Sequence, residues 1–283
     1  MVKLINEILL SAGSMVKVLF GKGPGRLLLV LILFVGLILF ALKGANQVPH
    51  VPEVDNYLKR LAESRRYLHL DLIGTAAFGI SGFLRAVKRR YDLWGALVLT
   101  MLPAVGGGMI RDLLIGGDRL PLFVFREPLY LVVILMVVLV GTILANTLSP
   151  GQLRSPVWGG LLCFCDSIGL ASFTVIGTRV AMLAHLDGWF LPLSAALTCA
   201  GGGVLMDVVS GREPSTFLGE PYEELAILGS LVLILLWTIA ARFAPLTWPS
   251  KTAMECSWIF VFLSRLLVVR FGWRSWRLPP SGN

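Results

Sequence analysis

Long apolar stretches separated by short polar segments run through most of this chain. Many of these stretches are about 18 to 20 residues long, the length at which a helix rising ~1.5 Å per residue crosses a ~30 Å hydrocarbon layer. The pattern predicts an all-α, polytopic membrane protein. The predicted spans are Leu27–Leu42, Leu68–Val87, Leu93–Ile115, Pro128–Asn146, Val157–Leu183, Phe190–Val209, Tyr222–Ala241 and Thr252–Val269.

The composition agrees with a membrane environment. Hydrophobic residues make up 56% of the 283 residues and charged residues 15%, whereas a soluble chain is about half apolar and a quarter charged. The net charge of +8 comes from Lys and Arg residues that flank the apolar stretches, where they suit anionic membrane lipids. They do not follow one face with interleaved aromatic residues, so we expect no nucleic-acid partner.

Residues 1–66 contain a predicted N-terminal transmembrane anchor helix and a polar linker. A cleaved signal peptide is the alternative, but the basic leader is long and no small-x-small cleavage pattern follows Phe40. Basic clusters at 85–90 and 265–277 favour a layout with both termini in the cytoplasm. The basic residues at 59–66 would then lie outside, which counts against this layout.

The sequence repeats itself at an offset of 95 residues, because the glycine triplet Gly106–Gly108 recurs as Gly201–Gly203. Many less common residues align at the same offset. These pairs include Asp71 with Asp166, Gly74 with Gly169, Phe78 with Phe173, Gly82 with Gly177, Asp92 with Asp187, Trp94 with Trp189 and Asp112 with Asp207. Chance would not produce such an alignment without a gap.

Each copy of the repeat holds three predicted spans. An odd number of crossings places the second copy in the opposite orientation, so the sequence predicts two inverted three-helix repeats. The first repeat covers residues 67–156, the second 157–249, and a seventh helix with a basic tail covers 250–283. Inverted repeats are common in transport proteins, with the pathway between the repeats. The alternative is a duplication kept for packing alone.

The two glycine triplets are the main candidate for a transport site. Glycine inside a helix costs ~1 kcal/mol relative to alanine, and close helix packing usually needs small residues four positions apart. We therefore predict that Gly106, Gly107 and Gly108, and likewise Gly201, Gly202 and Gly203, unwind or kink their helices. The freed carbonyl groups would have to face protein or a water-filled cavity.

Asp112 and Asp207 each follow the last glycine of a triplet by one helical turn. Carbonyl oxygens together with a carboxylate suit a hard cation. Arg111 also lies one turn after a glycine, but its repeat partner is Met206, so a fixed positive charge is expected in only one half of the pathway. The alternative for Arg111 and Asp112 is a helix-end ion pair directed to the membrane surface.

Three more charged residues within predicted spans are further candidates for the site. Asp71 and Asp166 precede runs of small residues, and they either line a vestibule or pair with a nearby Arg or Lys. Arg179 needs a partner or water, with Asp166 and Asp207 as candidates. The four cysteines lie in apolar stretches and are interpreted as small apolar residues. We expect no cofactor, and no metal other than a transported monovalent cation.

The segments Gly106–Asp112, Asp166–Phe173 and Arg270–Trp273 resemble the prokaryotic trimeric intracellular cation (TRIC) channels, also described as the bacterial glycine-transporter domain family. The resemblance covers about residues 68–277 and implies a 3+3+1 helix arrangement and a homotrimer in the bacterial inner membrane. It also implies a pore in each subunit, at the glycine triplets, that passes potassium and other monovalent cations. Met206 departs from the family, in which a basic residue is common there, and the N-terminal helix is additional.

These observations predict a passive monovalent-cation channel. The alternative is a secondary transporter of glycine or another small neutral amino acid, with its carboxylate on freed N–H groups and its ammonium on carbonyl oxygens and Asp112 or Asp207. An enzyme is not expected, because the sequence has no His-Glu-x-x-His, no Gly-x-Ser-x-Gly and no phosphate-binding glycine loop ending in Lys.

Overall fold

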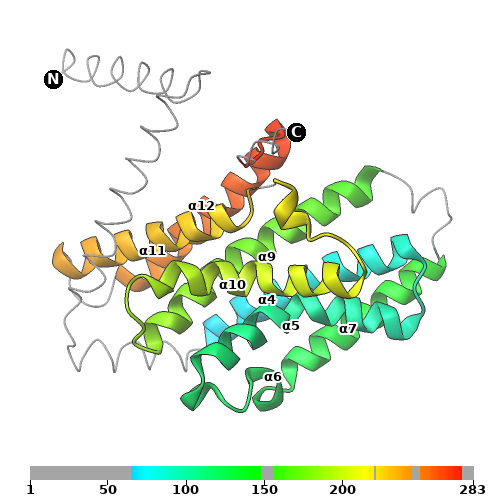
Figure 1. The fold of residues 1–283 in the computed structure, drawn as a ribbon, viewed down its shortest axis with the longest axis horizontal. Coiled ribbons are helices and arrows are strands. Elements are labelled where there is room, and N and C mark those ends of the chain that lie inside the picture. The colour runs from blue at the N-terminus through cyan, green and yellow to red at the C-terminus, as the bar shows by residue number, and fades with distance from the viewer. Residues whose placement is uncertain (1–64, 148–155, 220, 244–248, 276–283) are drawn as a thin grey trace, which may run out of the picture.

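The computed structural model describes residues 65–147, 156–219, 221–243 and 249–275, which form a bundle of helices (Figure 1). The long helices are α4 (Arg65–Arg89), α5 (Leu93–Ile115), α7 (Leu129–Thr147), α9 (Pro156–Leu183), α10 (Phe190–Val209), α11 (Glu223–Phe243) and α12 (Pro249–Phe271). The short elements are η1 (Gly117–Arg119), α6 (Phe123–Arg126) and η2 (Ser215–Leu218). The described residues contain no strand, so the all-α prediction is confirmed.

Six of the described helices are long and apolar enough to cross a membrane, namely α4, α5, α7, α9, α10 and α12. Helix α11 occupies the stretch that was predicted as the span Tyr222–Ala241. The predicted anchor helix Leu27–Leu42 lies outside the described residues. A helix of about 20 apolar residues is long enough to cross the hydrocarbon layer of a bilayer. With six such helices among the described residues, the chain is a multi-pass membrane protein.

The helices of each predicted repeat pack together. Helices α4, α5 and α7 contact one another, and so do α9, α10 and α11. Between these groups, the first helices α4 and α9 pack together, as do the second helices α5 and α10 (Figure 1). Helix α12 packs against α9 and α11.

The contact between α4 and α9 has the form expected of an inverted repeat. The Phe173 ring packs where a Cβ at Gly74 would lie, and the Phe78 ring packs where a Cβ at Gly169 would lie. The two rings meet edge to face with their centroids 5.0 Å apart. These four residues are two pairs of repeat partners, and residue numbers rise in opposite directions across the contact. The helices are therefore antiparallel, which supports the predicted inversion.

Local signals in the sequence fix the ends of α5. The carboxylate of Asp92 accepts a hydrogen bond from the backbone N–H of Gly95 at 2.7 Å, which caps the first turn. The helix ends at Gly116, whose φ of 66° suits glycine better than other residues. This end point places Arg111 and Asp112 in the last turns of the helix.

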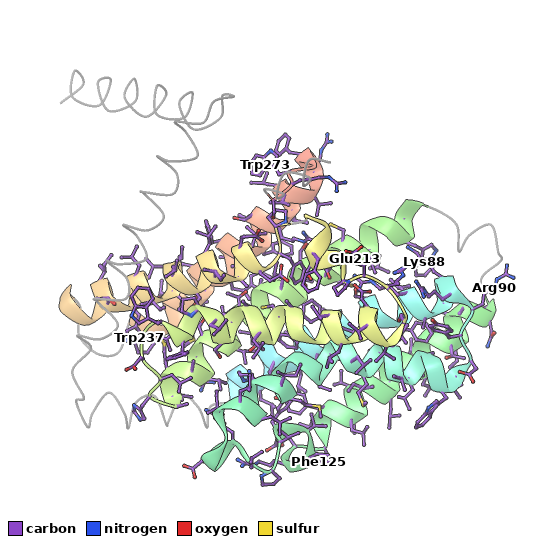
Figure 2. The ribbon with its side chains drawn as sticks, viewed as in Figure 1. Lys88, Arg90, Phe125, Glu213, Trp237 and Trp273 are labelled. Atoms are coloured by element: carbon purple, nitrogen blue, oxygen red, sulfur yellow. The ribbon has the colours of Figure 1, made fainter. Side chains whose placement is uncertain are left out.

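The outer surface of the bundle is apolar where lipid would cover it. Helix α7 buries only Tyr130, Ile134 and Val138 among its residues, and its remaining faces carry exposed Leu, Ile, Val and Met side chains. Lys88, in the last turn of α4, and Arg90, just after that helix, lie at one end of the bundle (Figure 2). Such a distribution separates a hydrocarbon-facing belt from a charged end.

Candidate functional site: a glycine crossing beside a charged cavity

The two glycine triplets lie where α5 and α10 cross. Both helices are continuous α-helix through the triplets, so the predicted local unwinding is wrong. Backbone groups at the triplets therefore remain within the helices, and the glycines have a different role. They allow two helices to approach until their backbones touch.

The middle glycines make the closest contacts. A Cβ on Gly202 would lie 2.5 Å from the carbonyl oxygen of Leu102, and a Cβ on Gly107 would overlap the carbonyl oxygen of Thr198. A Cβ on Gly106 would lie 3.3 Å from the Cα of Gly202. Because the helices run antiparallel here, adjacent glycines of one helix meet adjacent glycines of the other.

The third glycine of each triplet has different surroundings. A Cβ on Gly108 would meet the Phe123 ring at 2.9 Å. Nothing lies within 4 Å of the Cβ position of Gly203, which lines a cavity. The first two glycines of each triplet therefore pack against the opposing helix, whereas the third faces the Phe123 ring in one triplet and the cavity in the other.

On one side of the crossing, Arg111 and Asp112 form a buried ion pair. The Nε and Nη2 atoms of Arg111 lie 2.8 and 2.7 Å from Oδ1 of Asp112. The Nη1 atom of Arg111 donates to the hydroxyl of Thr198 on α10 at 3.5 Å. Both charged residues are at most 5% exposed, so the pair faces the protein interior and not the membrane surface.

Each group of helices contains an aspartate that is bonded to a tyrosine, and of the two aspartates Asp166 is buried and Asp71 is half-buried. The tyrosine lies at the start of the third helix in the first group and just before the third helix in the second. The Tyr130 hydroxyl donates to Oδ2 of Asp71 at 2.6 Å, and the Tyr222 hydroxyl donates to Oδ1 of Asp166 at 3.5 Å. Asp71 and Asp166 are repeat partners, whereas the tyrosines are offset by 92 residues because the preceding connections differ in length. The tyrosine pair is therefore not found when the sequence is compared with itself at the 95-residue offset alone.

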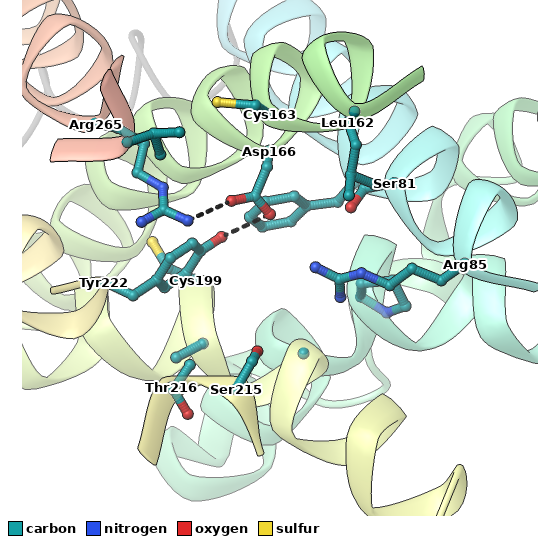
Figure 3. Close-up of a pocket in the computed structure, with 16 residues that line it drawn as sticks. Ser81, Arg85, Leu162, Cys163, Asp166, Cys199, Ser215, Thr216, Tyr222 and Arg265 are labelled. Carbon is teal, nitrogen blue, oxygen red and sulfur yellow. Dashed lines mark hydrogen bonds and ion pairs between the residues drawn. The ribbon is translucent and has the colours of Figure 1, made fainter. Parts of the chain in front are cut away.

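On the other side of the crossing lies a cavity of about 240 Å³ (Figure 3). Its walls come from α4, α5, α9, α10, η2 and α12. They are Phe78, Ser81, Arg85, Pro103, Gly159, Leu162, Cys163, Asp166, Cys199, Ala200, Gly203, Ser215, Thr216, Tyr222, Arg265 and Val269. The cavity reaches the crossing at Pro103 and Gly203 and is lined by both charged and hydroxyl side chains.

Asp166 pairs with an arginine from outside the predicted repeats. The Nη2 atom of Arg265, on α12, lies 3.2 Å from Oδ2 of Asp166. The Arg265 guanidinium also lies over the Tyr222 ring, 4.9 Å from its centroid. Asp166 therefore both lines the cavity and belongs to an ion pair, so the two interpretations of this residue hold together.

The expectation of positive charge in only one half is wrong, because Arg85 and Arg265 line the cavity on the other side of the crossing. Asp207 is buried, and its Oδ2 accepts a hydrogen bond from the backbone N–H of Ser215 at 3.0 Å. That bond holds η2 against the cavity. Arg179 is also buried.

Sequence reasoning missed Arg85, Tyr130, Tyr222 and Arg265. None of them has an identical residue at the 95-residue offset, and Arg265 lies beyond both predicted repeats. The available signal was physical, since an arginine within an apolar span requires a partner or water. Applied to Arg265, that rule would have indicated an acidic partner.

Comparisons with known proteins match most of the described helices. A family described as "Glycine transporter" matches residues 68–146 and 163–238, together more than half of the chain. The inner membrane protein YadS of Escherichia coli is 34% identical over 202 residues, 71% of this chain and 91% of that protein. The membrane protein YvgT of Bacillus subtilis is 33% identical over 168 residues, 59% of this chain and 79% of that protein.

Two solved structures share the fold and more than a quarter of the aligned residues. The TRIC trimeric intracellular cation channel orthologue from Rhodobacter sphaeroides is 28% identical with a TM-score of 0.63, covering 74% of this chain and 100% of that one. A structure described as showing conductance through TRIC cation channels is also 28% identical, with a TM-score of 0.60, covering 76% and 98%. The name of the Escherichia coli relative agrees with the expected inner-membrane location.

Proposed function

Because this chain belongs to the glycine-transporter domain family, which includes the TRIC channels, we propose that it is a passive channel for monovalent cations such as potassium. The chain has similar solved structures that are named cation channels, and one of them is named trimeric. We further propose a homotrimer with one pathway in each subunit. A transport role also fits the expectation that the chain is not an enzyme.

The observation that carries the proposal is the cavity that ends at the glycine crossing. It is lined by Asp166, Tyr222 and hydroxyl groups and reaches Pro103 and Gly203. Hydroxyl, carbonyl and carboxylate oxygens replace the water ligands of a hard cation. Beyond the crossing, Thr198 and the Arg111–Asp112 pair continue the polar lining toward the opposite side.

In the proposed mechanism the crossing is the constriction. Gly106 and Gly202 lie in backbone contact, so conduction requires α5 and α10 to separate at this point. Side-chain oxygens on both sides of the crossing can act as ligands for the cation. The mechanism therefore does not require backbone carbonyl groups that are freed by unwinding of the helices. Two of the arginines near the crossing are in ion pairs, Arg111 with Asp112 and Arg265 with Asp166, which limits their repulsion of a cation.

A carrier for glycine or another small neutral amino acid is the second candidate. The same cavity contains Arg85 and Arg265, which suit a carboxylate, and Asp166, which suits an ammonium group. A carrier would alternate its access and saturate with substrate, whereas a channel would conduct continuously.

Reconstitution of the full chain separates the two candidates. A channel predicts unitary potassium currents in planar bilayers, and no stimulation of labelled-glycine uptake by unlabelled glycine inside proteoliposomes. Glycine counterflow without unitary currents would reject the channel and support the carrier. Absence of both activities would reject both candidates.

A further inference from the structure

At position 206 the second repeat has a methionine where the first has Arg111. In the first half, the guanidinium of Arg111 reaches Thr198 of the opposing helix. The repeat partners of Arg111 and Thr198 are Met206 and Pro103. A basic side chain at position 206 would therefore be directed toward Pro103, on the wall of the cavity.

Arg85 on α4 lies at this position. Its Nη1 atom is 3.8 Å from Sδ of Met206, and its side chain lines the same cavity as Pro103. Figure 3 shows the Arg85 side chain directed into the cavity, across from Arg265 and Asp166. The repeat partner of Arg85 is Val180, which is buried and apolar. Each side of the crossing therefore has an arginine, and both come from the first repeat, Arg111 from α5 and Arg85 from α4.

The charge of Arg85 is not neutralised in the same way as that of the other arginine in the cavity. Asp166 is engaged by Arg265. Within the described residues, no carboxylate forms an ion pair with Arg85, and the sulfur of Met206 is a weak acceptor. Among the described residues that line the cavity, the two arginines, Arg85 and Arg265, outnumber the one carboxylate, Asp166.

We propose that Arg85 provides the fixed positive charge of the second half and sets how readily cations occupy the cavity, in place of a basic residue at position 206. This role rests on the proposed cation-channel function. A charge at the cavity wall, on the order of 6 Å from a cation in water, lowers cation occupancy by about threefold. Salt screens such an interaction, because the Debye length falls from about 30 Å at 0.01 M to 3 Å at 1 M.

The test is a transfer of charge between the two positions, measured as single-channel potassium conductance of the full chain in planar bilayers. Arg85→Met is expected to raise conductance about threefold in 0.01 M KCl and to leave it unchanged in 1 M KCl. Adding Met206→Arg to Arg85→Met returns the charge to the repeat position and is expected to restore wild-type conductance. Arg85→Lys keeps the charge in place and is expected to conduct like the wild type.

Arg90→Met is the matched control, because Arg90 is exposed and directed away from the bundle (Figure 2). Equal low-salt conductance of Arg85→Met and Arg90→Met would overturn the proposal, as would an increase that persists in 1 M KCl. If the double variant does not fold, Arg85→Lys provides the test. A threefold increase of its conductance in 0.01 M KCl would reject a role for the charge, because lysine keeps that charge. A silent wild type is a separate result, because it rejects the channel function itself.

Discussion

Replacing Gly202 by alanine should separate α5 from α10, whereas replacing the adjacent Gly203 should not. The new Cβ at position 202 would lie 2.5 Å from the carbonyl oxygen of Leu102. Carbon–oxygen contacts are normally no shorter than ~3.3 Å, so the helices must move apart by about 0.8 Å. A Cβ at position 203 has nothing within 4 Å.

The comparison isolates the packing cost. Both substitutions gain the same preference of alanine over glycine for a helix, ~1 kcal/mol, so this gain cancels between them. Overpacking typically costs about 1–3 kcal/mol, and a backbone carbonyl cannot rotate away as a side chain can. We therefore expect Gly202→Ala to be about 1–3 kcal/mol less stable than Gly203→Ala, or roughly 2–12 °C lower in melting temperature.

Thermal unfolding of the purified protein in detergent measures this difference. The double variant Gly107→Ala with Gly202→Ala gives a second measurement, because both methyl groups enter one crossing. Once one methyl group has separated the helices, the other destabilises the protein less. The loss of stability in the double variant should therefore be smaller than the sum of the losses in the two single variants. Equal melting temperatures for Gly202→Ala and Gly203→Ala would refute the assignment of the triplet as a packing contact.

Two further predictions concern the buried carboxylates. Asp166→Asn should lower the free energy of unfolding by about 3 kcal/mol, because it removes the carboxylate that pairs with Arg265. The double variant with Arg265→Met should lose less stability than the sum of the two single variants. Additive losses in thermal unfolding would contradict the pairing. Tyr130→Phe should cost about 2 kcal/mol, since it removes a 2.6 Å bond to a charged group, and Tyr222→Phe should cost less than half as much, since its bond is 3.5 Å. Equal unfolding temperatures for the two tyrosine variants would contradict this ranking.

The sequence predicted the helices well because the bilayer imposes a simple constraint. The span Leu68–Val87 corresponds to α4 at Arg65–Arg89, and Pro128–Asn146 corresponds to α7 at Leu129–Thr147. An apolar stretch in lipid must satisfy its backbone within one helix, so length and hydropathy determine its limits. The packing of Phe78 on Gly169, and of Phe173 on Gly74, joins residues that the sequence aligned at the 95-residue offset.

The role of the glycine triplets could not be predicted from one helix alone. Glycine lowers the stability of a helix by the same amount whether it permits unwinding or the close approach of another helix. Only the position of the opposing helix shows which of these two roles applies. Thr198 and Leu102 provide that information, because their carbonyl oxygens occupy the space beside Gly107 and Gly202. The antiparallel crossing also explains why consecutive glycines serve here in place of glycines spaced four apart.

The charges around the cavity were difficult to predict for another reason. Arg85 and Arg265 come from α4 and α12, which are far from Met206 and Asp166 in sequence. A repeat offset compares equivalent positions, and it does not detect a substitution of one helix for another. Such compensation depends on three-dimensional proximity.

Among the described helices α12 has no repeat partner, yet its Arg265 reaches a carboxylate whose repeat partner, Asp71, is bonded to Tyr130. A displacement of α12 would thus disturb one end of the molecule and leave the opposite end intact. Duplication alone would yield two faces with identical responses. The contacts of Arg265 with Asp166 and Tyr222 make the surroundings of the two repeat-related aspartates unequal.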